Sequence, residues 1–156
     1  MKPVWIVDDD RSIRWVIEKA LSREGIAYSS FSSAQEALDA LSGSAPEVLV
    51  SDVRMPGLSG LALFDQLVER GFTELLPVIF LTGHGDVPMA VDSLKRGAFD
   101  FFEKPFNDNQ LMDRVQEGLY GICATCGTDI GRERLDLLPY AVECVQCARR
   151  ADSQRN

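Results

Sequence analysis

Short apolar runs alternate with segments of helical spacing through the first 118 residues, and this alternation constrains the fold more than any other feature. The expected strands are residues 3–7, 26–31, 47–51, 77–81 and 98–102, and the expected helices are residues 11–24, 33–42, 58–70, 86–95 and 107–119. Repeated strand–helix–strand units with right-handed crossovers place parallel strands side by side and helices on both faces. We therefore predict an α/β domain with a five-stranded parallel sheet covered on both faces.

Polar residues follow four of these strands, at the edge where parallel sheets bind ligands. They are Asp8, Asp9 and Asp10 after the first strand, Asp52 after the third, Thr82 after the fourth and Lys104 after the fifth. Crowded carboxylates raise one another's pKa unless a cation lies among them, and Mg²⁺ prefers carboxylate, water and phosphate oxygens. A lysine and a threonine nearby could hold the remaining oxygens of a phosphoryl group. Taken singly, Asp10 or Ser12 has a simpler interpretation as a helix N-cap.

Four segments resemble, in order, the signatures of response-regulator receiver domains from two-component signalling. They are VWIVDDDRSIRW, VLVSDVRMPGLSG, IFLTGHGD and GAFDFFEKPF. The resemblance covers residues 1–118 and implies a flavodoxin-like receiver fold. It implies that Asp52 is the phosphoacceptor and takes a phosphoryl group from a sensor histidine kinase, forming an aspartyl phosphate. It also implies Mg²⁺ bound by Asp9, Asp52 and the backbone carbonyl of Arg54, with Asp8 acting mainly through water.

The same resemblance implies how a signal leaves the site. Lys104 would pair with the phosphoryl group, Thr82 would move toward a phosphoryl oxygen, and Phe101 would turn into the vacated space. Many relatives carry Tyr where this chain has Phe101, so we expect the output face to be read by shape; a Phe simply buried in its strand is an equally good interpretation. The family also implies a cis peptide before Pro105. We interpret His84, the only histidine, as a solvated loop residue.

All four cysteines of the chain lie near its C-terminus, as two CxxC pairs separated by 17 residues: Cys123, Cys126, Cys144 and Cys147. This spacing is typical of a structural four-thiolate Zn²⁺ site. A tail with few large apolar side chains buries little surface, and a structural Zn²⁺ contributes about 10 kcal/mol or more to folding such a module. Three alternatives are weaker. Disulfides are rare in the cytoplasm, and a thioredoxin-like redox site would not need a second CxxC pair. Catalytic zinc usually keeps one open coordination position, whereas four thiolates fill the coordination shell.

The tail also resembles the zinc finger of the DksA/TraR family of bacterial RNA-polymerase-binding regulators. The matching features are YGICATCG, Ile130, Arg134-Leu135, Pro139, Ala141 and CVQC. The resemblance covers residues 119–150, and we expect residues 151–156 to form a disordered tail. Those regulators carry a long coiled coil with an acidic tip before the finger, whereas a receiver occupies that place here. The resemblance therefore implies docking of the finger on polymerase or another protein rather than insertion into a polymerase channel.

Charge argues against an autonomous nucleic-acid-binding module. Residues 1–118 carry 19 acidic and 11 basic side chains, and residues 119–156 carry five of each. Nonspecific binding to nucleic acid depends on Lys and Arg neutralising phosphates, so direct DNA binding is not favoured. A DNA-binding regulator stays a third alternative because of four arginines in the tail: Arg132, Arg134, Arg149 and Arg150. Apolar runs are too short to span a bilayer and the N-terminus lacks the pattern of a secretion signal, so we expect a cytoplasmic protein without a membrane partner.

These features lead to two main hypotheses for function. The first is a two-component response regulator whose zinc finger modulates transcription through a protein contact, with RNA polymerase as the candidate partner. The close attachment of the finger to the last receiver helix, without a Gly/Ser or Pro-rich linker, favours a finger that responds to that helix. The second is a signalling adaptor or phosphorelay protein whose finger serves dimerisation or docking. We also expect a phosphorylation-dependent homodimer through the fourth and fifth strands and their helices, and no enzymatic output.

Overall fold

The predicted parallel sheet is present in the computed structural model, which describes residues 3–43, 45–71, 76–120, 123, 130–138, 143, 145–146 and 148–149. Its five strands lie in the order β2-β1-β3-β4-β5, and all neighbouring pairs are parallel. The strands are β1 (Val4–Val7), β2 (Tyr28–Phe31), β3 (Val48–Asp52), β4 (Val78–Thr82) and β5 (Asp100–Glu103). Each begins and ends within two residues of its predicted range.

Five helices follow the five strands, as predicted. They are α1 (Arg11–Arg23), α2 (Ala34–Ala40), α3 (Gly60–Glu69), α4 (Val87–Lys95) and α5 (Asp108–Gly118). Side-chain oxygens of Asp10, Ser33, Ser59 and Asn107 accept backbone N–H groups in the first turns of α1, α2, α3 and α5, which fixes where these helices begin. Two short elements were not predicted: the 3₁₀ helix η1 (His84–Asp86) and α6 (Arg132–Leu137). Both are too short to show a helical period in sequence.

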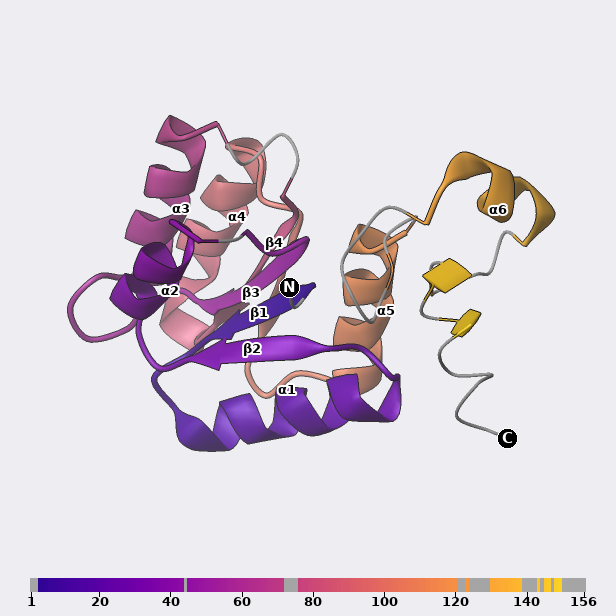
Figure 1. The fold of residues 1–156 in the computed structure, drawn as a ribbon. Helices are drawn as coiled ribbons and strands as arrows, with labels where there is room; N and C mark the ends of the chain where they lie inside the picture. Colours follow the sequence, from indigo (N-terminus) through magenta and orange to yellow (C-terminus); the bar gives the residue numbers. More distant parts are fainter. Residues whose placement is uncertain are drawn as a thin grey trace.

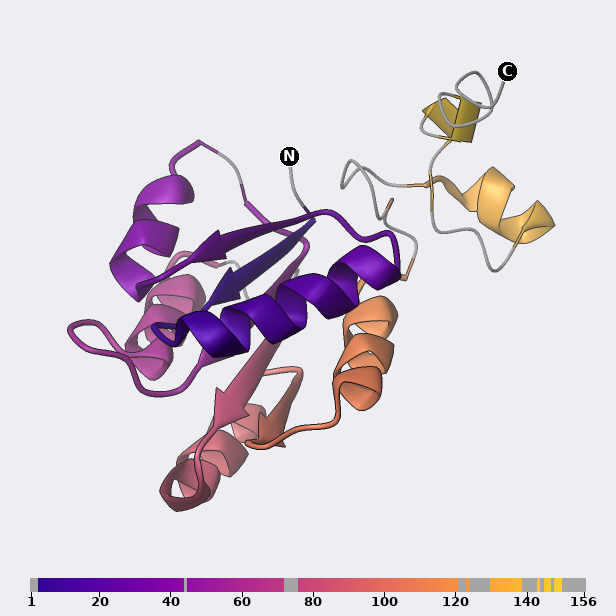
Figure 2. The ribbon, with the colours of Figure 1, turned by 90° about the horizontal axis from the view of Figure 1, so that it is seen from below.

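The helices form two layers around the sheet (Figures 1 and 2). Along β1, Val4 and Ile6 pack with residues of α1 and α5, whereas Trp5 and Val7 pack with residues of α2 and α3. This alternation follows from the two-residue period of a strand. The central strands β1, β3 and β4 are buried along their whole length, as expected for parallel strands covered on both faces. Polar side chains beyond their carboxyl ends are thus confined to one edge of the sheet.

The tail is described only in part. Cys123 and Ile130 are buried, and the Nε of Arg134 on α6 donates a hydrogen bond to the carbonyl oxygen of Glu143 at 2.9 Å. In Figures 1 and 2, α6 lies on the α5 side of the molecule. The expected zinc ligands Cys126, Cys144 and Cys147, and the tail 151–156, lie outside the described residues. Within the described part of the chain, no helix combines the length and apolar character needed to cross a bilayer.

Helix α3 begins directly against the end of β3, at Gly60. The Gly60 N–H donates to the carbonyl of Val53 at 3.0 Å. A Cβ placed on Gly60 would lie 1.8 Å from the carbonyl oxygen of Asp52 and 2.9 Å from the Oγ of Ser51. A side chain at position 60 therefore cannot fit unless α3 or the end of β3 moves.

We predict that Gly60→Ala lowers the free energy of unfolding by about 1–3 kcal/mol or more, because the added methyl group overpacks the β3–α3 contact. The matched control is Gly43→Ala, where the nearest atom to a new Cβ is the carbonyl oxygen of Ala40 at 3.9 Å. We expect the control to change stability by no more than about 0.5 kcal/mol. Urea unfolding followed by circular dichroism measures both. Equal effects of the two substitutions would refute the close-approach explanation.

Candidate functional site

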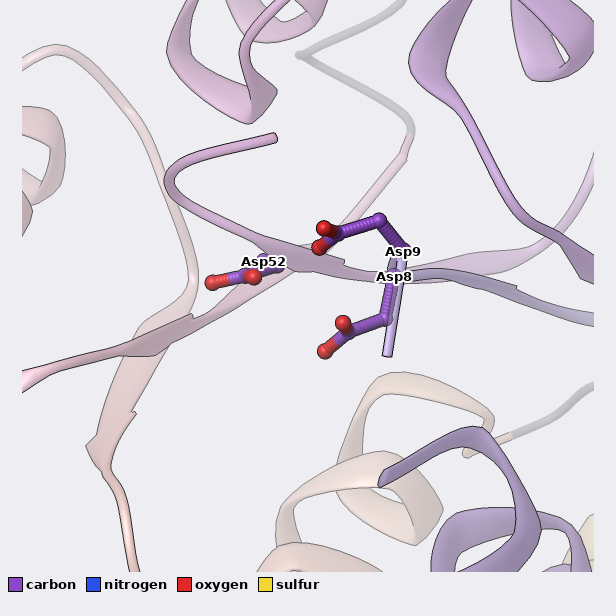
Figure 3. Close-up of side chains that lie close together, drawn as sticks. All are labelled: Asp8, Asp9 and Asp52. Atoms are coloured by element: carbon purple, nitrogen blue, oxygen red, sulfur yellow. The ribbon is translucent and has the colours of Figure 1, made fainter. Parts of the chain in front are cut away.

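Three carboxylates meet where β1 and β3 end (Figure 3). Asp8 and Asp9 directly follow β1, and Asp52 is the last residue of β3. One oxygen from each of the three lies within 4.8 Å of the others. The order of the strands reverses between β1 and β3, which is the position where open parallel sheets bind ligands.

Lys104, which directly follows β5, bridges two of these carboxylates. The Nζ of Lys104 lies 3.3 Å from the Oδ2 of Asp8 and 3.3 Å from the Oδ2 of Asp52. Its backbone N–H donates to the carbonyl of Thr82 at 2.8 Å, which holds the end of β5 against β4. The following peptide, to Pro105, is cis, as the family resemblance implied. The lysine thus supplies a positive charge between the two buried members of the cluster.

Burial perturbs the ionisation of these groups. Asp8 is fully buried, and burial raises its pKa to about 6; the N–H of Asp10 opposes this shift, the charge of Asp52 adds to it, and Lys104 opposes it. Burial also raises the pKa of Asp52, against the opposing effect of Lys104. Burial by itself would lower the pKa of Lys104, but the two carboxylates outweigh it and the net shift is upward. The single positive charge of Lys104 therefore does not fully offset the negative charge of the ionised carboxylates.

The arrangement fits a hard divalent cation. Asp8, Asp9 and Asp52 present only oxygen donors, which Mg²⁺ prefers, and they are close enough to share one ion. Asp9 is exposed, so that side of the cluster is open to solvent for water or phosphate oxygens. The residual negative charge left beside Lys104 provides the electrostatic reason for such an ion to bind.

The other predicted receiver-site residues are Thr82, Phe101 and Arg54, of which Arg54 contacts the carboxylate cluster. The hydroxyl of Thr82, fully buried, donates to the carbonyl of Gly83 at 3.1 Å. Phe101 is half-buried and packs against the core on the side of α2 and α3. The backbone N–H of Arg54 donates to the carboxylate of Asp52, and its Nε pairs with Asp86 at 2.6 Å.

Sequence reasoning missed two residues that touch the site. The Nη1 of Arg14, on α1, donates to the backbone carbonyl of Asp8 at 2.6 Å. Gly60 lies against the carbonyl of Asp52, as described above. An arginine on the first turns of a helix gives no sign in sequence that it reaches back to a strand end. Gly60 lies inside the VLVSDVRMPGLSG segment, but only its distance to β3 shows why a glycine is needed.

A doubly covered parallel sheet with three carboxylates and a lysine at its carboxyl edge defines a receiver-type α/β domain. The family described as "Response regulator receiver domain" matches residues 4–116, and the family described as "Prokaryotic dksA/traR C4-type zinc finger" matches residues 118–152. The chain belongs to the response-regulator receiver family, joined to a DksA/TraR-type zinc finger.

Individual relatives agree with this assignment. The chain is 50% identical over 114 residues to the DNA-binding transcriptional regulator NtrC of Klebsiella pneumoniae, which covers 71% of this chain and 24% of NtrC. It is 41% identical over 116 residues to the response regulator protein TodT of Pseudomonas putida, which covers 74% of this chain and 50% of TodT. The chain thus spans about a quarter of the length of NtrC and half that of TodT.

Solved structures show the same fold. The apo receiver domain of NtrC is 44% identical, with a TM-score of 0.68 over 76% of this chain and 94% of that one. Full-length FixJ from B. japonicum is 39% identical, with a TM-score of 0.70 over 76% of this chain and 57% of that one. These similarities support the flavodoxin-like receiver fold.

We predict that Asp8→Asn stabilises the metal-free protein above about pH 6. The folded-state pKa of Asp8, about 6, exceeds its ordinary value of 3.8, so the folded chain binds this proton more tightly than the unfolded chain. Ionisation of Asp8 therefore costs stability as the pH rises through this range, by at most about 3 kcal/mol. The amide removes that cost, and the gain should shrink toward about pH 4.

Urea unfolding in chelator at about pH 4.5 and about pH 8 measures this difference. Asp39→Asn, an exposed carboxylate on α2, is the control for removing one negative charge away from the cluster. A gain that is the same at both pH values, or no larger than that of the control, would contradict the assignment of a costly buried charge to Asp8.

Proposed function

We propose that this response regulator is switched by phosphorylation of Asp52, which accepts a phosphoryl group from a sensor histidine kinase. The supporting observation is the cluster itself: Asp52 lies beside two further carboxylates, with the ammonium of Lys104 3.3 Å from its Oδ2. In the transfer, an oxygen of Asp52 forms a bond to phosphorus while the bond from phosphorus to the histidine nitrogen of the kinase breaks. Phosphoryl transfer depends mainly on positioning and charge stabilisation, which this site supplies.

The surrounding residues divide this work. Asp9, Asp52 and the backbone carbonyl of Arg54 would hold Mg²⁺ directly, with Asp8 acting mainly through water, and the ion would neutralise charge on the carboxylates and phosphoryl oxygens. Lys104 pairs with a phosphoryl oxygen, for which its present position between Asp8 and Asp52 prepares it. We assign these roles because carboxylate oxygens and a lysine ammonium suit Mg²⁺ and phosphoryl oxygens, and because the chain belongs to the receiver family.

The signal then passes to the β4–β5 side of the domain. We propose that the hydroxyl of Thr82 leaves the carbonyl of Gly83 for a phosphoryl oxygen, and that Phe101 turns toward the vacated space. Phe101 already packs on the core beside β4, so a small shift of Thr82 changes its surroundings. The same surface is where a phosphorylation-dependent homodimer would form.

The receiver, residues 1–118, passes its state to a zinc finger at residues 119–150, and residues 151–156 form a tail. Cys123, Cys126, Cys144 and Cys147 are the proposed ligands, and four thiolates would hold Zn²⁺ in a closed, structural site. Burial of Cys123 suits a ligand at the centre of a small module. The finger modulates transcription through a protein contact, with RNA polymerase as the candidate partner.

Contacts of Arg114 with Asp100 and Phe99, called the clamp below, would carry a shift of β5 toward the finger. On α5, the Nε of Arg114 pairs with Asp100 at 2.8 Å, and its guanidinium lies 4.2 Å from the ring centre of Phe99. The clamp fastens the start of β5 to α5, and only four residues separate Gly118 from Cys123. A shift of β5 therefore reaches the attachment point of the finger.

We predict that the purified protein gains one phosphoryl group from acetyl phosphate and Mg²⁺, and that Asp52→Asn abolishes the gain because the nucleophilic oxygen is lost. Intact-mass spectrometry measures it, and sensitivity to hydroxylamine identifies an acyl phosphate. Asp39→Asn, which removes a carboxylate far from the site, should be phosphorylated like wild type. Phosphorylation of the Asp52→Asn protein to the wild-type level would disprove the assignment.

We further predict that core RNA polymerase retains the protein more strongly when beryllofluoride and Mg²⁺ are present, and that Cys123→Ser loses this retention with its zinc. Pull-down with purified polymerase tests the contact, and native mass spectrometry should find one zinc per wild-type chain. Onward transfer of phosphate to a histidine phosphotransfer protein, without polymerase binding, would favour the adaptor role instead. A steeply salt-dependent gel shift would favour DNA binding.

A further inference from the structure

Every polar group of Asp8 is held by a neighbour. Its N–H donates to the carbonyl of Phe31 at 3.1 Å, its Oδ1 accepts the N–H of Asp10 at 2.8 Å, and its Oδ2 lies 3.3 Å from Lys104. The remaining group, its backbone carbonyl, accepts the 2.6 Å hydrogen bond from Arg14 described above. Through this hydrogen bond Arg14, half-buried on α1, links that helix to the end of β1.

The carbonyl of Asp8 belongs to the peptide that leads into Asp9. Among the residues that the structure describes, the carboxylate of Asp9 forms no hydrogen bond or ion pair, yet it points into the cluster with Asp8 and Asp52 (Figure 3). Its direction therefore depends on the backbone that carries it. Two side chains hold that backbone: Asp8, whose Oδ1 accepts the N–H of Asp10, and Arg14, which donates to the Asp8 carbonyl itself.

We infer that Arg14 is a positioning residue for the metal site: by holding the Asp8–Asp9 peptide, it keeps the carboxylate of Asp9 aimed at the position of the ion. This inference rests on the proposed Mg²⁺ site. Hydrogen bonds from outside the ligand shell typically change metal affinity by about 10- to 100-fold when they are lost. A guanidinium bonded to the backbone has the fixed geometry that such a role requires.

Two physical effects of Arg14 have opposite signs, which makes the inference testable. As a cation bonded to the backbone of Asp8, Arg14 opposes Mg²⁺ by Coulomb repulsion, so its removal would tighten Mg²⁺ binding if charge were its main effect. As a positioning residue it favours Mg²⁺, so its removal weakens binding. A residue that only stabilises the fold would leave the Mg²⁺ affinity of the folded protein unchanged.

The experiment compares Arg14→Gln with Arg11→Gln in the full chain. Arg11 lies on the same helix and is exposed, so its substitution removes an equal charge without removing the hydrogen bond to Asp8. Backbone amide shifts in NMR spectra, recorded during titration with MgCl₂, report the dissociation constant, and urea unfolding reports stability separately. We expect Arg14→Gln to weaken Mg²⁺ binding about tenfold or more relative to Arg11→Gln.

Mg²⁺ binding by Arg14→Gln that equals or exceeds that of Arg11→Gln would overturn the inference. If wild type itself shows no shifts with Mg²⁺, the proposed metal site fails instead, so the two failures are distinguishable. Should Arg14→Gln not fold, the pair Arg14→Lys and Arg11→Lys replaces it. Lysine keeps the charge but loses the planar fork, so Arg14→Lys should bind Mg²⁺ several-fold more weakly than its control, and equal binding would overturn the inference.

Discussion

Repulsion among three carboxylates is the constraint on which the rest of the site depends. The parallel order of the sheet brings the ends of β1 and β3 together, and with them Asp8, Asp9 and Asp52. Burial of Asp8 and Asp52 then removes water that would otherwise screen their charges. Lys104 offsets part of the repulsion, and the remaining negative charge favours a divalent cation at the site. The affinity proposed for a cation thus follows from the carboxylates at the carboxyl edge of the sheet, whose negative charge exceeds the positive charge of Lys104.

The scaffold tolerates this charge because the rest of the domain is packed conventionally. Two apolar clusters, one on each face of the sheet, bury the strands from both sides. Contacts from the following helices also reach the ends of β1 and β3: Arg14 on the carbonyl of Asp8, and Gly60 against the carbonyl of Asp52. A well-packed interior therefore allows a destabilised edge, as is common where a protein binds ligands.

The sheet, its five helices and the gathering of polar residues at one edge could be predicted because they depend on local period and on strand ends. Asp8, Asp9, Asp52 and Lys104 follow apolar runs that are easily recognised. The contacts of Arg14, Gly60 and the Arg54–Asp86 pair could not be predicted, since each joins elements whose separation only the folded chain sets. The elements η1 and α6 were missed because three and six residues are too few to show a period.

The clamp of Arg114 on Phe99 and Asp100 has a consequence for how such proteins diversify. Its residues all lie within the receiver and before Gly118, between α5 and the start of β5. Any module spliced onto the chain after that residue is attached to the helix that β5 already holds. A different module joined at this junction would therefore meet the same held helix, with the clamp residues unchanged.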